Sequence, residues 1–343
     1  MNEENKELVN ETAPAAKVKQ KKRLHPIIYT PLTVVLTFVL MLAGQFLGYF
    51  MLPVKLYMNL EPKWIFIIEM YLSFLGIHIV ILLHSFIFNR DVFWSYFPRK
   101  DNGNNLKMLG WGIIAGFLMN AFCIAVAWLH KDIHFTIGRF DVLYMLVAFL
   151  FVFIQSSAEE VTTRGFMYQR LRNRINPWIA AFLNSFLFAA LHLGNPGVSR
   201  LAIFNIFMFG FAMSVVMVFT NSLWFCMGLH TAWNYCQNIF FGLPNSGLVS
   251  QGSFFHLEAS RGSVFYDPRF GVEATVMTTL VQLRLIRYFA YKYARKPEQT
   301  VSATADAVAP TVEPVLTETI EDKQDAETAS AETVELTSDE ESE

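Results

Sequence analysis

The chain has 343 residues, of which 53% are hydrophobic by type, and its mean hydropathy is +0.34. This apolar content is too high for an ordinary water-soluble domain, so composition alone favours a protein embedded in a membrane. The formal net charge of −2 gives no reason to expect a nucleic-acid partner.

The net charge hides an uneven distribution along the chain. Residues 297–343 contain 14 Asp or Glu and one Lys, which leaves 26 Lys or Arg against 15 Asp or Glu elsewhere. Because this acidic segment has no aromatic residue and no apolar period, we expect residues 293–343 to form a disordered cytoplasmic tail. Residues 1–25 are polar and basic and lack the short apolar segment of a cleaved signal peptide, so we expect a second cytoplasmic tail there.

Apolar stretches of about 20 residues are typical of helices that span a bilayer, and eight candidates occur in this chain. The fourth and the eighth are the weakest, because polar residues interrupt them. We therefore predict an all-α, polytopic integral membrane protein with about eight transmembrane helices, three of them within residues 26–141. The predicted spans are Ile27–Leu52, Trp64–Phe88, Leu109–Leu129, Val142 to about Arg170, Trp178–Leu193, Leu201–Phe219, Leu223–Phe241 and Val272–Ala290.

The distribution of Lys and Arg between alternate connections predicts how the helices are oriented. One side, which includes both chain ends, carries 19 such residues near the spans, and the other side carries seven. Because positive residues concentrate on the cytoplasmic side, we expect a multi-pass protein of the cell membrane with both termini in the cytoplasm. That arrangement needs an even number of spans, and eight satisfies it.

Three short motifs place ionisable side chains within or beside these apolar stretches. They are EEVTTR, which begins at Glu159, FAALH, which ends at His192, and HTAWN, which begins at His230. An ionisable group at membrane depth costs roughly 3 kcal/mol or more, so its default role is functional. Carboxylates and imidazoles gathered in a wet cavity are the groups needed to activate a water molecule. The sequence thus predicts a water-activating enzyme built within the membrane.

Distances along the helices indicate that these side chains meet. Asn176 stands before a proline that marks the turn between the fourth and fifth spans. Glu159 lies 17 residues before Asn176, and His192 lies 16 residues after it. At 1.5 Å per residue both are roughly 25 Å from the turn, so they are expected at nearly one depth. His230 lies about eight residues past the turn at 220–222 and is also expected below the membrane surface.

Local spacing pairs the side chains within each motif. His230 and Asn234 are four residues apart and share one helix face, as do Glu160 and Arg164. Glu159 and Glu160 point about 100° apart, so they are expected to have different roles. Each motif alone also fits an ordinary explanation: an interfacial ion pair, a hydrogen-bonded core histidine or a polar helix contact. Their joint occurrence at compatible depths favours a functional site.

The three motifs resemble those of the CAAX-protease and bacteriocin-processing (CPBP) family of intramembrane proteases, which includes the type II CAAX prenyl endopeptidases. The family's pattern is EExxxR, FxxxH and HxxxN or HxxxD, each on its own membrane helix, and the chain has all three in that order. The neighbouring segments HLGNPGVS, SLWFCMGLHTAWNYCQ and FGLPNSGL extend the similarity over residues 140–292, about half of the chain. The resemblance implies a catalytic transmembrane domain in residues 142–292.

The resemblance also implies roles for the motif residues. Glu159 and His192 would activate the attacking water. His230 and Asn234 would stabilise the oxyanion or hold the water.

The remaining two motif residues, Glu160 and Arg164, would support the first carboxylate. The family often has an aromatic residue directly before the arginine, whereas this chain has Thr163. That departure concerns packing more than chemistry.

The cofactor stays open at this point, because the family has been described both as metal-dependent and as glutamate-dependent without a tightly bound metal. Glu159, His192 and His230 would complete a catalytic Zn²⁺ site with an open position. No HExxH motif is present, so these ligands would come from three separate helices. We favour water activation by glutamate and histidine, with one zinc ion as the alternative.

The three motifs and the resemblance predict an intramembrane endopeptidase that acts on a membrane-bound protein or peptide. No residue indicates whether that substrate is prenylated. One alternative is a catalytically silent immunity or scaffold protein of the same fold, which would not need all four site residues. A second alternative is a proton-coupled transporter, in which intramembrane Glu and His are equally natural. The sequence shows no inverted repeat to support it.

Overall fold

The computed structural model describes residues 24–294, apart from residues 54, 56 and 139. The chain divides into two units, Met1–Tyr293 and Ala294–Glu343, and the fold described here is that of the first. The two predicted tails, residues 1–25 and 293–343, lie almost entirely outside the described residues.

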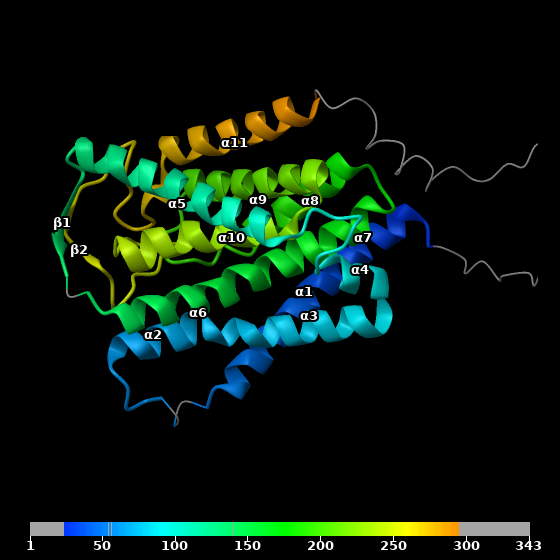
Figure 1. Ribbon diagram of the computed structural model, residues 1–343, viewed down its shortest axis with the longest axis horizontal. Helices are drawn as coiled ribbons and strands as arrows, with labels where there is room; N and C mark the ends of the chain where they lie inside the picture. Colours follow the sequence, from blue (N-terminus) through cyan, green and yellow to red (C-terminus); the bar gives the residue numbers. More distant parts are fainter. Residues whose placement is uncertain (1–23, 54, 56, 139, 295–343) are drawn as a thin grey trace, which may run out of the picture. The chain divides into compact units, whose positions relative to one another are not determined.

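Helices make up most of the described residues, which confirms the predicted all-α class. In Figure 1 most helices run with their axes roughly along one direction, and two short strands lie at one end of them. The helices are α1 (Pro26–Met51), α2 (Pro62–Met70), α3 (Leu75–Phe88), α4 (Arg90–Ser95), α5 (Leu106–Leu129), α6 (Val142–Glu160), α7 (Gln169–Arg172), α8 (Pro177–Ala190), α9 (Arg200–Thr220), α10 (Leu223–Asn234) and α11 (Val276–Ala294), and the strands are β1 (Ile133–Ile137) and β2 (Phe255–Ser260).

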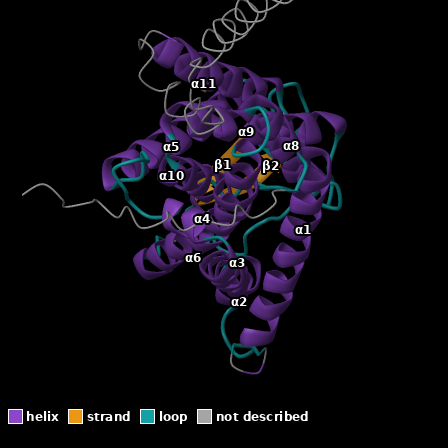
Figure 2. Ribbon diagram, turned by 90° about the vertical axis from the view of Figure 1, so that its right-hand side faces the viewer, coloured by secondary structure: helices purple, strands orange, loops and turns teal. Residues whose placement is uncertain are grey.

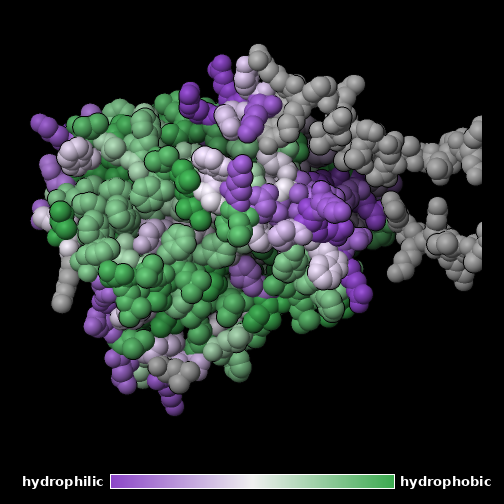
Figure 3. All heavy atoms as spheres, viewed as in Figure 1, coloured by the Kyte–Doolittle hydropathy of each residue, from purple (hydrophilic) through white to green (hydrophobic). Residues whose placement is uncertain are grey.

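Several of these helices are suited to a bilayer. Five helical segments of the described chain are long and apolar enough to cross a membrane. Hydrophobic residues cover most of the middle of the face in Figure 3, and hydrophilic residues gather toward its edges. The protein is therefore a polytopic membrane protein, with candidate spans at Pro26–Met51, Pro62–Phe88, Leu106–Leu129, Val142–Arg172 and Arg200–Thr220.

The predicted count of eight spans is not confirmed. Helices α8 and α10 have only 14 and 12 residues, and α11 is not among the five candidate spans. The eighth predicted span also begins later than expected, because Val272–Ala274 forms a 3₁₀ turn (η5) and Thr275 is extended. The second predicted span is likewise interrupted by a 3₁₀ turn (η2) at Leu72–Phe74.

The helix boundaries follow local sequence signals. Pro177 begins α8, and Asn176 accepts a hydrogen bond from the backbone N–H of Trp178, so the predicted hairpin turn is present. This type of side-chain cap satisfies an N–H group that has no partner within the helix. Equivalent caps begin α5, α6, α9 and α10, where the capping residues are Asn105, Asp141, Ser199 and Ser222.

Glycines bring α5 and α10 into close contact. A Cβ atom at Gly112 would lie 2.2 Å from a carbonyl oxygen of α10, and one at Gly116 would lie 2.1 Å from the next such oxygen on that face. From the other side, a Cβ atom at Gly228 would lie 2.4 Å from a carbonyl oxygen of α5. Only glycine fits these positions, and the spacing is the small-residue pattern that packs helices within membranes. This contact positions α10, which carries His230.

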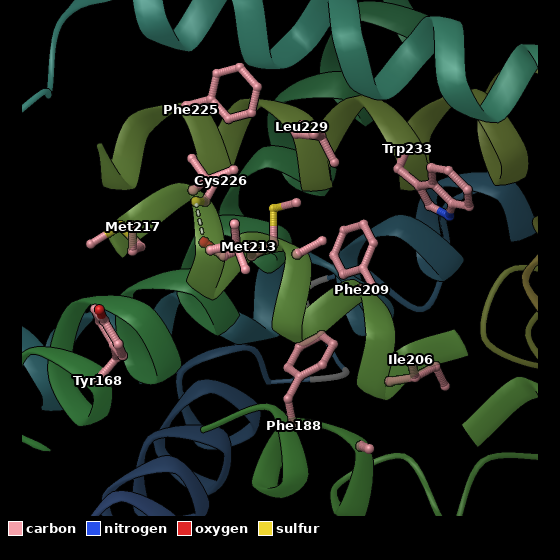
Figure 4. Close-up of a cluster of buried hydrophobic side chains, with 14 of the residues drawn as sticks. Tyr168, Phe188, Ile206, Phe209, Met213, Met217, Phe225, Cys226, Leu229 and Trp233 are labelled. Carbon is pink, nitrogen blue, oxygen red and sulfur yellow. Dashed lines mark hydrogen bonds between the residues drawn. The ribbon is translucent and has the colours of Figure 1, made fainter. Parts of the chain in front are cut away.

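Large side chains fill the space between α8, α9 and α10. Figure 4 shows Phe188 of α8, Phe209 and Met213 of α9, and Cys226 and Trp233 of α10 in one cluster. The thiol of Cys226 donates to the carbonyl oxygen of Met213 at 3.5 Å, within this packing. Since lipid supplies little hydrophobic drive for helix association, such close packing is what holds the helices together.

The connections after α5 and before η5 contain a small antiparallel sheet of β1 and β2, which sequence periodicity did not predict (Figure 2). In it Ile133 pairs with Ser260 and Ile137 with Phe255. Next to β1 the buried carboxylate of Asp132 accepts from Ser263 Oγ at 2.5 Å and from Arg261 Nε at 3.0 Å. Burial raises the pKa of Asp132, but these hydrogen bonds and one from a neighbouring histidine hold the pKa below its usual value.

Candidate active site

The motif residues lie where two helices change from α to π geometry. Glu159 and Glu160 are the last residues of α6, which continues as a π-helix (η3) over Val161–Tyr168. His230 lies in the last turn of α10, which continues as a π-helix (η4) over Tyr235–Phe240. Segments of π-helix are rare and occur often at functional sites, so their presence directly after two motifs is informative.

Glu160 is a fully buried carboxylate with two partners. Its Oε1 accepts from Arg164 Nη1 at 3.0 Å and lies 2.9 Å from Nδ1 of His230. Arg164 is also fully buried, and its guanidinium lies over the ring of Phe188 at 4.4 Å. The predicted pair of Glu160 and Arg164 is therefore present, and it holds one of the two adjacent carboxylates in the protein interior.

Glu159 faces a different environment, because it lines a cavity. Its Oε1 accepts from Gln155 Nε2 at 2.6 Å, whereas its Oε2 has no hydrogen-bond partner. The imidazole of His230 is close to this oxygen, because its Nε2 lies 3.8 Å from Glu159 Oε2, but this is beyond hydrogen-bond distance. Both adjacent carboxylates thus keep an Oε2 without a partner, but only Glu159 lines the cavity.

Both motif histidines have one ring nitrogen fixed by an acceptor. His192 Nδ1 lies 2.8 Å from the carbonyl oxygen of Phe188, and a carbonyl only accepts, so Nδ1 carries the hydrogen. In the neutral ring this leaves the lone pair on Nε2. His230 is held in the same sense, because its Nδ1 donates to the carboxylate of Glu160. Hydrogen bonds of this kind set the tautomer and orientation of a functional histidine.

A cavity of about 350 Å³ brings the motif residues together. Glu159, His192, His230 and Asn234 all line it, so the three motifs meet as the spacing along the helices predicted. One part of its wall comes from α1 to α3 and is mostly apolar. Another part holds most of the polar side chains and comes from α6, the loop after α8, α9, α10 and the residues after α10. The apolar part includes Met41, Leu42, Met70, Phe74 and Ile77, and the polar part includes Gln155, Asn195, Asn205, Asn245 and Glu273.

Asn234 is already engaged with the end of α6. Its Nδ2 donates to Gln155 Oε1 at 3.2 Å and to Ser156 Oγ at 3.3 Å, and its Oδ1 accepts from Asn245 at 3.3 Å. These bonds are long for their type, so they are readily exchanged for a bond to substrate. The structure therefore places Asn234 at the site as part of a side-chain network.

Three polar residues of this network were not predicted from the sequence. Gln155 lies four residues before Glu159 within an apolar run, and that spacing could have revealed it. Glu273 was visible as a carboxylate within the weak eighth span, but it belongs to no motif. Asn245 lies in a loop within FGLPNSGL, a segment that extends the family resemblance, but it belongs to none of the three motifs.

The structure does not bring Glu69, His78 or His84 of the second span into the cavity. Glu69 lies within reach of the hydroxyl of Tyr57, at 3.4 Å. His78 uses Nε2 for contacts with α6, including Ser157 Oγ at 3.0 Å, and His84 packs between phenylalanine rings. These side chains have roles in packing.

The proposed zinc ligands do not form a complete set. Among the residues that the structure describes, no group of three His, Cys, Asp or Glu side chains is placed to hold a metal ion. Glu159, His192 and His230 line one cavity without converging on one point.

Comparison with known proteins agrees with the three motifs. Residues 140–236 match the family model for type II CAAX prenyl endopeptidase Rce1-like proteins, which confirms the resemblance inferred from the motifs. The matched segment contains all six motif residues. The chain is also 29% identical over 185 residues to the uncharacterized protein YyaK of Bacillus subtilis (strain 168). The aligned segment covers 50% of this chain and 60% of that relative.

Proposed function

We propose that the protein is an intramembrane endopeptidase in which Glu159 and His192 activate a water molecule. The observation that carries the proposal is the contrast between the two adjacent carboxylates. Each carboxylate keeps one oxygen without a hydrogen-bond partner, but Glu160 is fully buried and bonded to Arg164 and His230, whereas Glu159 lines the cavity and has no arginine partner. A general base needs such a free oxygen within reach of water and substrate.

The first step is attack by water. Glu159 Oε2 accepts a proton from the water, which His192 Nε2 helps to orient through its lone pair. The resulting hydroxide forms a bond to the carbonyl carbon of the peptide, and the carbonyl oxygen takes the negative charge. A positioned base of this kind contributes roughly 10²- to 10⁴-fold to the rate.

The second step is departure of the amine. The amide of Asn234 donates to the oxyanion, and His230, fixed through Nδ1 on Glu160, holds the attacking water through the lone pair of Nε2. The proton taken up by Glu159 passes to the leaving nitrogen, the carbon–nitrogen bond breaks, and a carboxylic acid and an amine result. Donors held in place before the reaction stabilise such charge without further reorganisation.

The two-part cavity wall supports a substrate that is partly lipid-embedded. The apolar part from α1 to α3 suits a lipid-anchored or transmembrane portion, and the polar part suits the peptide bond to be cleaved. A membrane-bound protein or peptide can enter such a site sideways from the bilayer. With both termini in the cytoplasm, as the Lys and Arg distribution predicts, cleavage takes place near the cytoplasmic face.

The test is proteolysis by the purified full chain in lipid vesicles. The probes are peptides that each carry an apolar membrane anchor at one end, and the products are identified by mass spectrometry. We expect wild type and Glu258→Gln, an exposed carboxylate on β2, to cleave the same bonds, and Glu159→Ala to cleave none. Absence of cleavage by folded wild-type protein would instead favour a silent scaffold of the same fold.

A further inference from the structure

A third carboxylate, Glu273, is built into the cavity wall outside the motifs and beyond the segment matched by the family. It lines the cavity with only 8% of its surface exposed. Its backbone is held from α9, because Asn205 Nδ2 donates to the carbonyl oxygens of Glu273 and Thr275 at 2.7 and 2.8 Å. The η5 turn therefore presents this side chain from a fixed position.

The carboxylate of Glu273 stabilises a tight turn. Asn245 and Leu248 exchange two backbone hydrogen bonds of 2.9 Å, and the residues between them, Ser246 and Gly247, have φ angles of 50° and 87°. A left-handed backbone costs a serine about 1 kcal/mol or more, unlike a glycine. Glu273 Oε2 accepts from the N–H of Ser246 at 2.6 Å and from its Oγ at 3.3 Å, which offsets that cost.

From this turn a chain of side-chain hydrogen bonds leads to the reactive carboxylate. Asn245 Nδ2 donates both to Glu273 Oε1 at 3.1 Å and to Asn234 Oδ1 at 3.3 Å. Asn234 Nδ2 then donates to Gln155 Oε1 at 3.2 Å. Gln155 Nε2 in turn donates to Glu159 Oε1 at 2.6 Å.

The chemistry of its two ends fixes the direction of this chain. In the structure both carboxylates accept, because Glu159 takes its hydrogen bond from the NH₂ of Gln155 and Glu273 takes one from the NH₂ of Asn245. Each amide between them can then turn only one way without placing two donors or two acceptors together. Replacing either end by a donor removes one of the two constraints.

We infer that Glu273 is a positioning residue for the proposed peptidase reaction: through Asn245 it sets the orientation of the Asn234 amide and, through Gln155, of Glu159. The inference rests on the proposed function. Glu273 acts through other side chains and does not itself touch the reacting atoms. A misplacement of about 1 Å at a reacting group costs up to ~10²-fold in rate, which sets the scale of the expected effect.

The first test compares Glu273→Gln with wild type in the vesicle cleavage assay. We expect kcat to fall roughly tenfold to hundredfold, because misplaced reacting groups lose rate rather than binding, and KM to change less than about twofold. The matched control is Asp132→Asn, another buried carboxylate that accepts several hydrogen bonds but lies away from the cavity. We expect it to keep the wild-type kcat.

A second variant separates orientation of the amides from stability of the turn. The double substitution Asn245→Asp with Glu273→Gln restores a bond between the two side chains, but residue 245 then accepts and no longer donates to Asn234. We expect its unfolding temperature to recover toward wild type while kcat stays low. If Glu273→Gln alone does not fold, the kcat of the double variant is compared with that of wild type instead.

Each outcome decides between these accounts. Wild-type kcat in folded Glu273→Gln, or recovery of kcat together with stability in the double variant, would overturn the positioning role and leave the proposed function intact. Failure of the wild-type enzyme to cleave any probe would contradict both the proposed function and this inference.

Discussion

Two adjoining regions of the chain supply most of the polar side chains of the cavity, and they differ in how visible these residues are in the sequence. Residues 142–236 supply Glu159, His192 and His230, each of which stands out as an ionisable group against an apolar helix. The segment after α10 supplies Asn245 and Glu273 from a tight turn and a 3₁₀ turn. The contrast teaches that reacting groups in a membrane protein are conspicuous, whereas the groups that orient them are found only in three dimensions.

The largest expected effect on kcat comes from the motif histidines of residues 142–236. His192→Ala and His230→Ala should each lower kcat by roughly 10²- to 10⁴-fold, because both histidines serve one water molecule at one carbonyl. Groups that act as a unit give losses that do not add, so the double variant should be little worse than either single one. Steady-state cleavage of one anchored peptide measures all three. Losses that multiply would show two independent roles and contradict the single-site account.

The next effect concerns the buried ion pair that separates Glu160 from Glu159. Arg164→Met leaves the carboxylate of Glu160 buried without its cation, which should cost about 3–5 kcal/mol of unfolding free energy. The control is Arg99→Met, which removes a partly exposed pair with Asp101 and should cost less than about 1 kcal/mol. Denaturant unfolding in detergent micelles compares the two variants. Equal and small losses would mean that Glu160 does not depend on Arg164.

Removal of metal ions is expected to have a smaller effect on the cleavage rate. If Glu159 and the two histidines activate water directly, prolonged treatment with a strong chelator should change the cleavage rate by less than about twofold, and elemental analysis should find far less than one metal per chain. One equivalent of zinc that is lost together with activity, and restores it when added back, would replace direct activation by a zinc site. The peptidase assignment would stand in that case.

The smallest effect is expected from the acidic segment. Removal of residues 297–343 should leave cleavage within about twofold of the full chain, because its sequence is acidic and has no apolar pattern with which to enter the site. The cleavage assay on the inserted, truncated protein checks this. Loss of activity in such a protein would reveal a regulatory or substrate-recruiting role.

Sequence reasoning reached the fold class and the meeting of the motifs for clear physical reasons. Long apolar runs have few alternatives to membrane helices, and the proline after Asn176 fixed the hairpin that brings Glu159 and His192 to one cavity. It also predicted the Glu160–Arg164 pair, because side chains four residues apart on a helix are neighbours.

The remainder depended on long-range contacts that no local pattern encodes. The 3₁₀ turn that delays α11 exists because Glu273 and its backbone are bonded to the turn at Ser246 and to Asn205. The pairing of β1 with β2 joins segments more than 100 residues apart. Neither follows from periodicity, which reports only on neighbours within one element.

The most direct measurement of the central claim is the residual activity of Glu159→Gln. Glutamine keeps the shape of the side chain but cannot take a proton from water, so a correctly folded variant should lose at least about a hundredfold in kcat. Its unfolding temperature should stay close to that of wild type, since the oxygen of the new amide can still accept from Gln155 Nε2. A folded Glu159→Gln protein that retains more than about a tenth of wild-type activity would contradict the assignment of Glu159 as the base.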